Sequence, residues 1–163
     1  MLYPPTPITR FALYPAQLAL SQIISSIAKR QPRLFARLGE YSSKRFFINP
    51  TNLPVALLLE PCPENPKLRV LFKNKEHPPF DVHISGKFMT LLDMANGKSD
   101  GDALFFSRDL SIEGDTGAVV ALRNALDDMD NSLLEEIALS FGVFGSLIKK
   151  LLEIKGKKSS TYE

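Results

Sequence analysis

The first part of the chain carries apolar positions with a helical period. Residues three and four apart share one side of a helix, and four apolar side chains follow that spacing: Leu20, Ile23, Ile24 and Ile27. Proline fits the first turn of a helix and interrupts its interior. We therefore predict a helix that starts at Pro15 and ends before Pro32, followed by a short helix from Pro32 to about Glu40.

The middle of the chain changes to short apolar runs separated by turn residues. Runs of this length that are rich in β-branched and aromatic side chains are typical of strands. We predict strands over residues 45–49, 55–59, 68–72, 80–85 and 109–113. The short spacers favour an antiparallel meander over parallel crossovers, which need longer connections.

Two further helices are predicted next to these strands. The first spans about residues 87–95 and ends at Asn96-Gly97, a pair typical of helix C-termini. The second follows Gly114, with Thr116 or Asp115 as its N-cap and with Val119, Leu122 and Leu126 on one face.

The last predicted helix, residues 132–154, is apolar around much of its circumference, whereas a surface helix needs only one apolar stripe. We expect part of it to cover a tunnel mouth or to enter a membrane interface, with basic side chains near anionic head groups. A packed helix or a dimer interface is the alternative. The residues concerned are Phe141, Val143, Phe144, Leu147, Ile148, Lys149 and Lys150.

Length and composition predict a single globular domain with extensions. The 163 residues are 44% hydrophobic, enough to bury a core without metals or disulfides. The expected parts are an N-terminal helical arm (1–43), a central domain (44–130) and a C-terminal amphipathic helix with a basic tail (131–163). The lone Cys62 suits a reducing compartment. No secretory signal and no membrane-spanning run is evident, so we expect a cytoplasmic protein, peripheral to the inner membrane at most.

Charge is segregated along the chain. Residues 1–50 carry seven basic side chains and one acidic one, whereas residues 51–130 carry eight basic and thirteen acidic ones. A basic arm next to an acidic body suits anionic lipid, an acidic partner or nucleic acid. It is equally consistent with a solvated helix face, and charge alone does not choose between these alternatives.

Residues 100–116 carry a motif: a paired aromatic, a short strand ending in Gly-Asp, and an apolar helix. These features are Phe105-Phe106, residues 110–113, Gly114-Asp115 and the segment from Thr116 onward. The motif resembles the signature region of the sterol carrier protein 2 family, and the resemblance covers about residues 44–128. The N-terminal helices and residues 45–50 further resemble a bacterial branch of ubiquinone-biosynthesis accessory proteins, the UbiT-like proteins.

The resemblance implies an α+β fold in which a mainly antiparallel five-stranded sheet and helices enclose an apolar tunnel that binds lipid. It also implies a non-catalytic carrier of polyprenylated intermediates in oxygen-independent ubiquinone synthesis, with hydroxylase partners and no cofactor. A general fatty-acyl or sterol-like carrier and a lipid-modifying enzyme or scaffold subunit are the alternatives.

The candidates for lipid contact are the inward-facing apolar residues of the predicted helices and strands. The same residues could instead form a solid core, as most apolar stripes do. They are Phe88, Leu91, Leu92, Phe105, Phe106, Leu110, Ile112, Val119 and Leu122.

Other chemistry has weaker support in the sequence. Cys62, His77 and His83 lack any familiar metal-ligand spacing. A cluster of carboxylates suggests general acid–base chemistry, but its members fall in turns or on outward strand positions where acidic residues are common: Asp100, Asp102, Asp109, Glu113 and Asp115. Nucleic-acid binding lacks a recognition-helix pattern. We therefore expect no catalytic residue, no metal site and no nucleic-acid partner.

Overall fold

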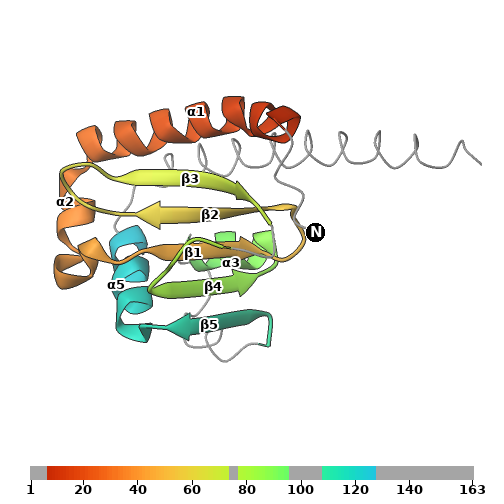
Figure 1. The fold of residues 1–163 in the computed structure, drawn as a ribbon. Coiled ribbons are helices and arrows are strands. Elements are labelled where there is room, and N and C mark those ends of the chain that lie inside the picture. The colour runs from red at the N-terminus through yellow and green to blue at the C-terminus, as the bar shows by residue number, and fades with distance from the viewer. Residues whose placement is uncertain (1–6, 74–76, 96–107, 128–163) are drawn as a thin grey trace, which may run out of the picture.

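The computed structural model describes residues 7–73, 77–95 and 108–127, which form an α+β fold (Figure 1). Its helices are α1 (Pro7–Arg30), α2 (Pro32–Ala36), the 3-10 helix η1 (Gly39–Ser43), α3 (Phe88–Ala95) and α5 (Thr116–Asp127). Its strands are β1 (Phe46–Pro50), β2 (Val55–Glu60), β3 (Lys67–Phe72), β4 (Val82–Gly86) and β5 (Leu110–Gly114).

The five strands form one sheet in the order β3-β2-β1-β4-β5. Three pairings are antiparallel, but β1 and β4 are parallel, with Phe47 opposite His83. A mainly antiparallel sheet is confirmed, whereas the simple meander is wrong at this pair. Short spacers exclude parallel pairing only between consecutive strands. The β2–β3 hairpin separates β1 from β4, so the chain returns to the free side of β1 in its original direction.

Helix α1 begins earlier than predicted. It starts at Pro7, and Pro15 lies inside it. A proline removes one hydrogen bond and crowds the preceding turn, so the sequence predicted a helix start there. The residues that follow, Ala16 and Leu20, are each only 2% exposed. This packing holds the helix together across the proline. The end of α1 at Arg30, before Pro32, matches the prediction.

The second helix is shorter than predicted. Helix α2 ends at Ala36, and the chain continues through η1. Gly39 has a φ of 52°, a left-handed conformation that glycine adopts readily and that does not continue an α-helix. The chain thereby turns from the helical region toward β1.

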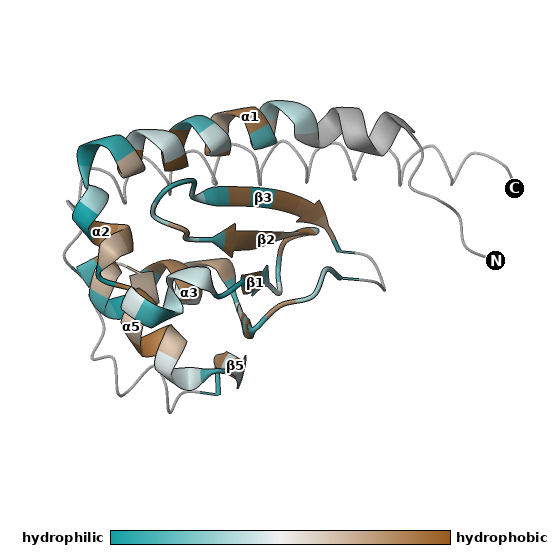
Figure 2. Ribbon diagram, turned by 60° about the vertical axis from the view of Figure 1, so that its left-hand side comes forward, coloured by the Kyte–Doolittle hydropathy of each residue, from teal (hydrophilic) through white to brown (hydrophobic). Residues whose placement is uncertain are grey.

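The helices lie on one face of the sheet and along one of its edges. Helices α2, α3 and α5 pack with β1, β4 and β5 in one hydrophobic cluster, and α1 runs beside β3 (Figure 1). The apolar colouring of β2 and β3 in Figure 2 continues along most of both strands. We call the helix-covered side of the sheet the inner face and the opposite side the outer face.

Helix α1 also occupies the hydrogen-bonding edge of β3. The Gln17 amide donates to the Leu68 carbonyl oxygen and accepts from the Val70 N–H, each at 2.8 Å. An unpaired strand edge is a template for pairing with another chain, and the Gln17 side chain satisfies both the Leu68 carbonyl and the Val70 N–H.

Within the described ranges, no helix is long and apolar enough to cross a membrane.

Candidate functional site

The inner face is built from alternate residues of the central strands. Successive side chains of a strand point to opposite faces, so Phe46, Val82 and Ile84 share one side of the sheet. All three are completely buried. The parallel register pairs Phe46 with Val82, which places two large apolar side chains next to each other at the centre of the face.

The helices close this face with apolar side chains of their own. Burial in the shared cluster removes these groups from water and stabilises the packing of each helix by roughly 25 cal/mol per Å² of apolar surface. The buried members from the helices are Ile24, Ile27, Leu34, Phe35, Leu91, Met94, Ala118, Val119, Leu122 and Ala125, and Leu38 joins them from the turn between α2 and η1.

Most of the predicted lipid-contact residues meet in this layer. Leu91, Leu110, Val119 and Leu122 are buried members of the cluster, and Ile112 packs against it. They come from α3, β5 and α5, so the fold brings together three segments that are separate in sequence.

The remaining predicted lipid-contact residues lie elsewhere. Phe88 packs against a second cluster formed by Leu20, Val55, Leu57 and Val70, and Leu92 is half-buried. Phe105 and Phe106 lie outside the described residues. The same is true of the predicted tunnel-mouth and membrane residues Phe141, Val143, Phe144, Leu147, Ile148, Lys149 and Lys150.

Sequence reasoning missed the contribution of β1 and β4 to this layer. Phe46, Val82 and Ile84 are among the most buried side chains of the described ranges. A signal was present, because residues 80–85 alternate apolar and polar positions as a half-buried strand does. The alternation does not show which strands are neighbours in the sheet. Only the observed strand order gives this information.

The chemistry of the inner layer is uniformly apolar. Among the described residues, no buried side chain is polar or charged, and no group of three or more potential metal ligands comes together. Burying a polar group without a partner is costly, so an apolar layer of this kind selects apolar contacts. The arrangement suits hydrophobic binding, and it offers no acid, base or nucleophile from the described part of the chain.

The carboxylates that suggested acid–base chemistry do not converge on this layer. Asp109 and Glu113 are exposed. Asp115 is the N-cap of α5, because its Oδ1 accepts from the Ala118 N–H at 3.1 Å, and it also pairs with Lys44 at 3.5 Å. Asp100 and Asp102 lie outside the described residues. The described members therefore have structural or solvent-facing positions.

The Gly-Asp element of the motif has a structural explanation. Gly114 has a φ of 95°, and a Cβ atom there would lie 2.3 Å from the Asp81 carbonyl oxygen. A Cβ atom at Gly117 would lie 2.7 Å from the Tyr41 hydroxyl oxygen. Glycine at 114 lets β5 end against β4, and Asp115 then starts α5. The motif thereby sets the position of α5 over the inner face.

The two histidines lie on the outer side of the sheet. The rings of His77 and His83 each contact Phe47 and Phe80, with centroid separations of 5.0–5.5 Å. The Nδ1 atom of His83 lies 3.7 Å from the Glu113 carboxylate, and its Nε2 atom is buried without a hydrogen-bond partner. The histidines are thus packed in an aromatic cluster, and they do not line the inner face.

Comparison with known proteins identifies the fold. Residues 24–127 match the SCP-2 sterol transfer family. No curated protein matches the chain. A solved structure titled "UbiJ-SCP2 Ubiquinone synthesis protein" is similar over 77% of this chain and 94% of its own, with a TM-score of 0.52 and 16% identity. Sterol Carrier Protein 2 from Yarrowia lipolytica, in its apo form, is similar over 66% of this chain and 84% of its own, with a TM-score of 0.47 and 12% identity.

The family match covers more than half of the chain and includes the inner face and the helices above it. It starts within α1 and ends with α5, so it extends the resemblance seen in the sequence toward the N-terminus. The family resemblance and the expected α+β fold are both confirmed. The chain belongs to the SCP-2 sterol transfer family of lipid carriers.

Proposed function

We propose that the protein carries a polyprenylated intermediate of oxygen-independent ubiquinone biosynthesis and performs no chemistry on it. The lipid would lie between the inner face of the sheet and α3 and α5. The similar fold of the UbiJ-SCP2 ubiquinone synthesis protein supports the choice of pathway, and the family membership supports the carrier role.

The observation that carries the proposal is the uniformly apolar layer over the inner face. Its described members include no buried polar or charged side chain. A polyprenyl tail gains about 25 cal/mol for each Å² of surface that such a layer removes from water, and it requires no directed polar contact along its length. The layer therefore fits a long hydrocarbon better than a small polar substrate.

The predicted tunnel belongs to this proposal. Its walls would combine Leu91, Leu110 and Val119 of the described layer with Phe105 and Phe106, and the C-terminal segment would close its mouth. Presentation of the bound lipid to hydroxylase partners at the surface of the inner membrane is part of the same hypothesis.

The first test identifies the lipid that accompanies the protein. The protein would be purified from cells grown at low oxygen, and its extracted lipids analysed by mass spectrometry. A stoichiometric polyprenylated phenol supports the proposal. Mixed fatty acids or phospholipids would replace it with a general fatty-acyl carrier. A well-folded sample with no lipid would contradict the carrier role and favour a solid core.

Two neighbouring residues of α5 provide a matched pair of variants. Val119 is 1% exposed and faces the inner layer, whereas Val120 is 47% exposed. Val119→Phe adds a ring where the lipid would lie, so we expect bound lipid to fall severalfold. Val120→Phe adds the same ring on the solvent side and should leave lipid content unchanged.

The pair also controls for folding. Overpacking a core can destabilise it by about 1–3 kcal/mol, so circular dichroism and thermal unfolding would be measured for both variants. A folded Val119→Phe protein with undiminished lipid would contradict binding beneath α5. Equal lipid loss in both variants would indicate a nonspecific effect of the added ring and would argue against a binding site beneath α5.

A further inference from the structure

The two edge strands of the sheet carry opposite charges on the outer face. Lys67 and Arg69 of β3 are exposed, and the register of β3 with β2 places their side chains on that face. Glu113 of β5 is exposed on the same face, and the exposed Asp109 directly precedes the strand. Figure 1 shows β3 and β5 at opposite ends of the sheet. One chain therefore has a basic edge and an acidic edge, which point away from each other.

The backbone of β5 is unpaired on its free side. In β4, the Val82 N–H and the Gly86 carbonyl oxygen form hydrogen bonds toward β1 and its flanking residues, at 3.1 and 2.8 Å. Successive residues of a strand direct their backbone groups to opposite neighbours, so Ser111 and Glu113 are the β5 residues that face β4. The N–H and carbonyl groups of Ile112 therefore point away from the sheet, and no described residue forms a hydrogen bond with them.

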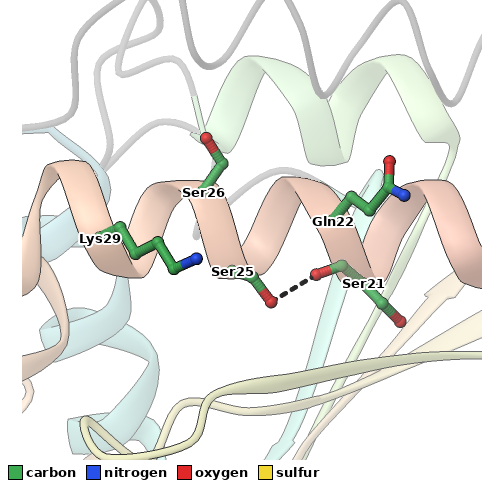
Figure 3. A pocket seen from close by; sticks show the side chains of 5 residues that line it. All are labelled: Ser21, Gln22, Ser25, Ser26 and Lys29. Carbon is green, nitrogen blue, oxygen red and sulfur yellow. Dashed lines mark hydrogen bonds between the residues drawn. The ribbon is translucent and has the colours of Figure 1, made fainter.

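The edge of β3, in contrast, is closed by Gln17 of α1. A primary amide has two N–H donors, and the Gln17 amide uses both, one to the Leu68 carbonyl oxygen at 2.8 Å and one to the Ser21 Oγ atom at 2.9 Å. Ser21 thereby holds the amide in position. Ser21 also lines a hollow of about 400 Å³ on the surface of α1, together with Gln22, Ser25, Ser26 and Lys29 (Figure 3). One side chain with a neighbour on the surface thus closes the basic edge.

The two edges match in direction and in register. Strands β3 and β5 run in opposite directions within the sheet, so β3 of a second copy can extend the sheet beyond β5 as an antiparallel neighbour. A register that pairs Val70 with Ile112 aligns the outward backbone groups of both strands over their full length. The same register places opposite charges across from each other on the outer face: Lys67 and Asp115, Arg69 and Glu113, and Lys73 and Asp109.

Pairing of two β5 strands is less favourable. An antiparallel pair centred on Ile112 would place Asp109 of one copy opposite Asp115 of the other. Opposite charges across a strand pair stabilise it, whereas like charges destabilise it. Charged side chains on an edge strand deter pairing, but the acidic side chains of β5 deter only strands of the same sign. The acidic edge therefore selects a strand with basic side chains at alternate positions, as β3 has.

We propose that the free edge of β5 is a docking site for the β3 edge of a second copy of this chain, and that Gln17 keeps β3 closed until α1 moves away from it. Arg69 already pairs with Glu60 at 3.2 Å, but its side chain is 49% exposed and can also reach a carboxylate of the next copy. A head-to-tail contact of this kind leaves one edge free at each end, so it builds a ring or an open chain of copies. The contact does not depend on which lipid the inner face carries.

The first test presents the β3 edge alone to the intact protein. A fluorescent peptide with the sequence of residues 67–73 is titrated with the full wild-type chain, and fluorescence anisotropy measures the binding. We expect saturable binding that E113R weakens by roughly twofold to thirtyfold, because the reversal replaces an attractive cross-strand pair by a repulsive one. D127R makes the same reversal at an exposed position of α5 and should bind like the wild type. Absent binding, or equal losses in the two variants, would overturn the docking site.

Two changes in the peptide separate strand pairing from simple charge attraction. Arg69→Glu in the peptide should weaken binding to the wild-type chain and restore binding to E113R. Methylation of the Val70 amide nitrogen keeps every charge but removes the N–H that would donate to the Ile112 carbonyl oxygen, so binding should fall at least about fivefold. Undiminished binding of the methylated peptide would overturn pairing at the β5 edge.

The role of Gln17 is tested in the full chain by sedimentation velocity. Q17A should self-associate as its concentration rises, whereas Q22A, at an exposed glutamine of the same helix, should behave like the wild type. Adding E113R to Q17A should abolish the association, and adding R69E to both should restore it. Circular dichroism would verify the fold of each variant. A folded Q17A that sediments like the wild type, or an association that survives E113R, would overturn this role of Gln17.

Discussion

The two faces of the sheet both bury apolar side chains, but they do so against different neighbours. On the inner face, Phe46 and Ile84 are completely buried beneath α2, α3 and α5. On the outer face, Ala56 and Leu58 are also completely buried, and Phe47 is 7% exposed. Burial alone therefore does not separate a candidate binding layer from an ordinary core. What separates them is the element that covers each face.

The outer face is covered partly by the segment that leads into β4. Phe80 stacks on Phe47 with a centroid separation of 5.7 Å, and Leu71 and Phe80 pack against Ala56 and Leu58. An ion pair lies beside this small cluster, because Arg69 is opposite Leu58 in the pairing of β2 with β3 and lies 3.2 Å from Glu60. The short segment that leads into β4 covers only a few side chains of the outer face. It does not provide the continuous apolar layer that several helices build on the inner face.

Adjacent residues of β1 allow the two faces to be compared within one strand. The largest effect is expected for Phe46→Ala on the inner face, because truncating a fully buried phenylalanine costs about 3–5 kcal/mol. Urea unfolding would measure the loss of stability. If the inner face binds lipid, the variant should also lose bound lipid. Unchanged lipid in a folded variant would argue against contact at this position.

Phe47→Ala makes the corresponding change on the outer face. We expect a smaller loss of about 2–4 kcal/mol, because the covering segment can move inward and fill part of the cavity. Lipid content should stay at the wild-type level when measured by mass spectrometry. A lipid loss as large as that of Phe46→Ala would show that the two faces are not functionally distinct.

The smallest expected effect concerns the anchor of the covering segment. The Asp81 Oδ2 atom accepts from the Arg45 N–H at 2.7 Å and from Arg45 Nε at 3.3 Å. The backbone hydrogen bond, followed by the Arg45 side chain, lowers the pKa of Asp81 below its ordinary value. Asp81→Asn should therefore reduce stability at pH 7, by about 1 kcal/mol after allowing for partial exposure.

The pH dependence of this effect has a definite sign. A carboxylate whose pKa is lowered by folding contributes stability that is fully present above its unfolded pKa of about 3.9 and is lost as the pH falls through the folded value. The difference between wild type and Asp81→Asn should thus shrink below about pH 4. Asp127→Asn, an exposed control on α5, should show no such trend in urea unfolding. A difference that stays constant into acid would contradict this role of Asp81.

Local patterns predicted most elements to within a few residues. The alternation around Val82 and Ile84 and the helical spacing of Val119 and Leu122 identified the correct element types. The start of α1 was wrong because a local rule for proline was applied where burial of Ala16 and Leu20 dominates. The N-cap was predicted as Thr116 or Asp115, and the hydrogen bond to Ala118 assigns it to Asp115.

The candidate site was predictable in kind but not in full. Apolar stripes selected Leu91, Leu110, Val119 and Leu122, which the fold collects in one layer. Phe46 was missed because β1 is apolar on both sides, and a run such as Phe46-Phe47-Ile48 does not reveal which residue faces the helices. That choice depends on the pairing of Phe46 with Leu59 and Val82.

Local sequence patterns were enough to predict the α+β class, the positions of the strands and the motif around Gly114 that marks the family, because these depend on the periodicity and backbone preferences of short segments. Three features became known only from the folded chain: β1 and β4 run parallel, Gln17 closes the β3 edge, and Arg30 of α1 and Arg33 of α2 line one hollow. These features join residues that are distant along the chain or depend on how two elements turn against each other. These features are stabilised by contacts between distant residues, and no local sequence pattern encodes such contacts.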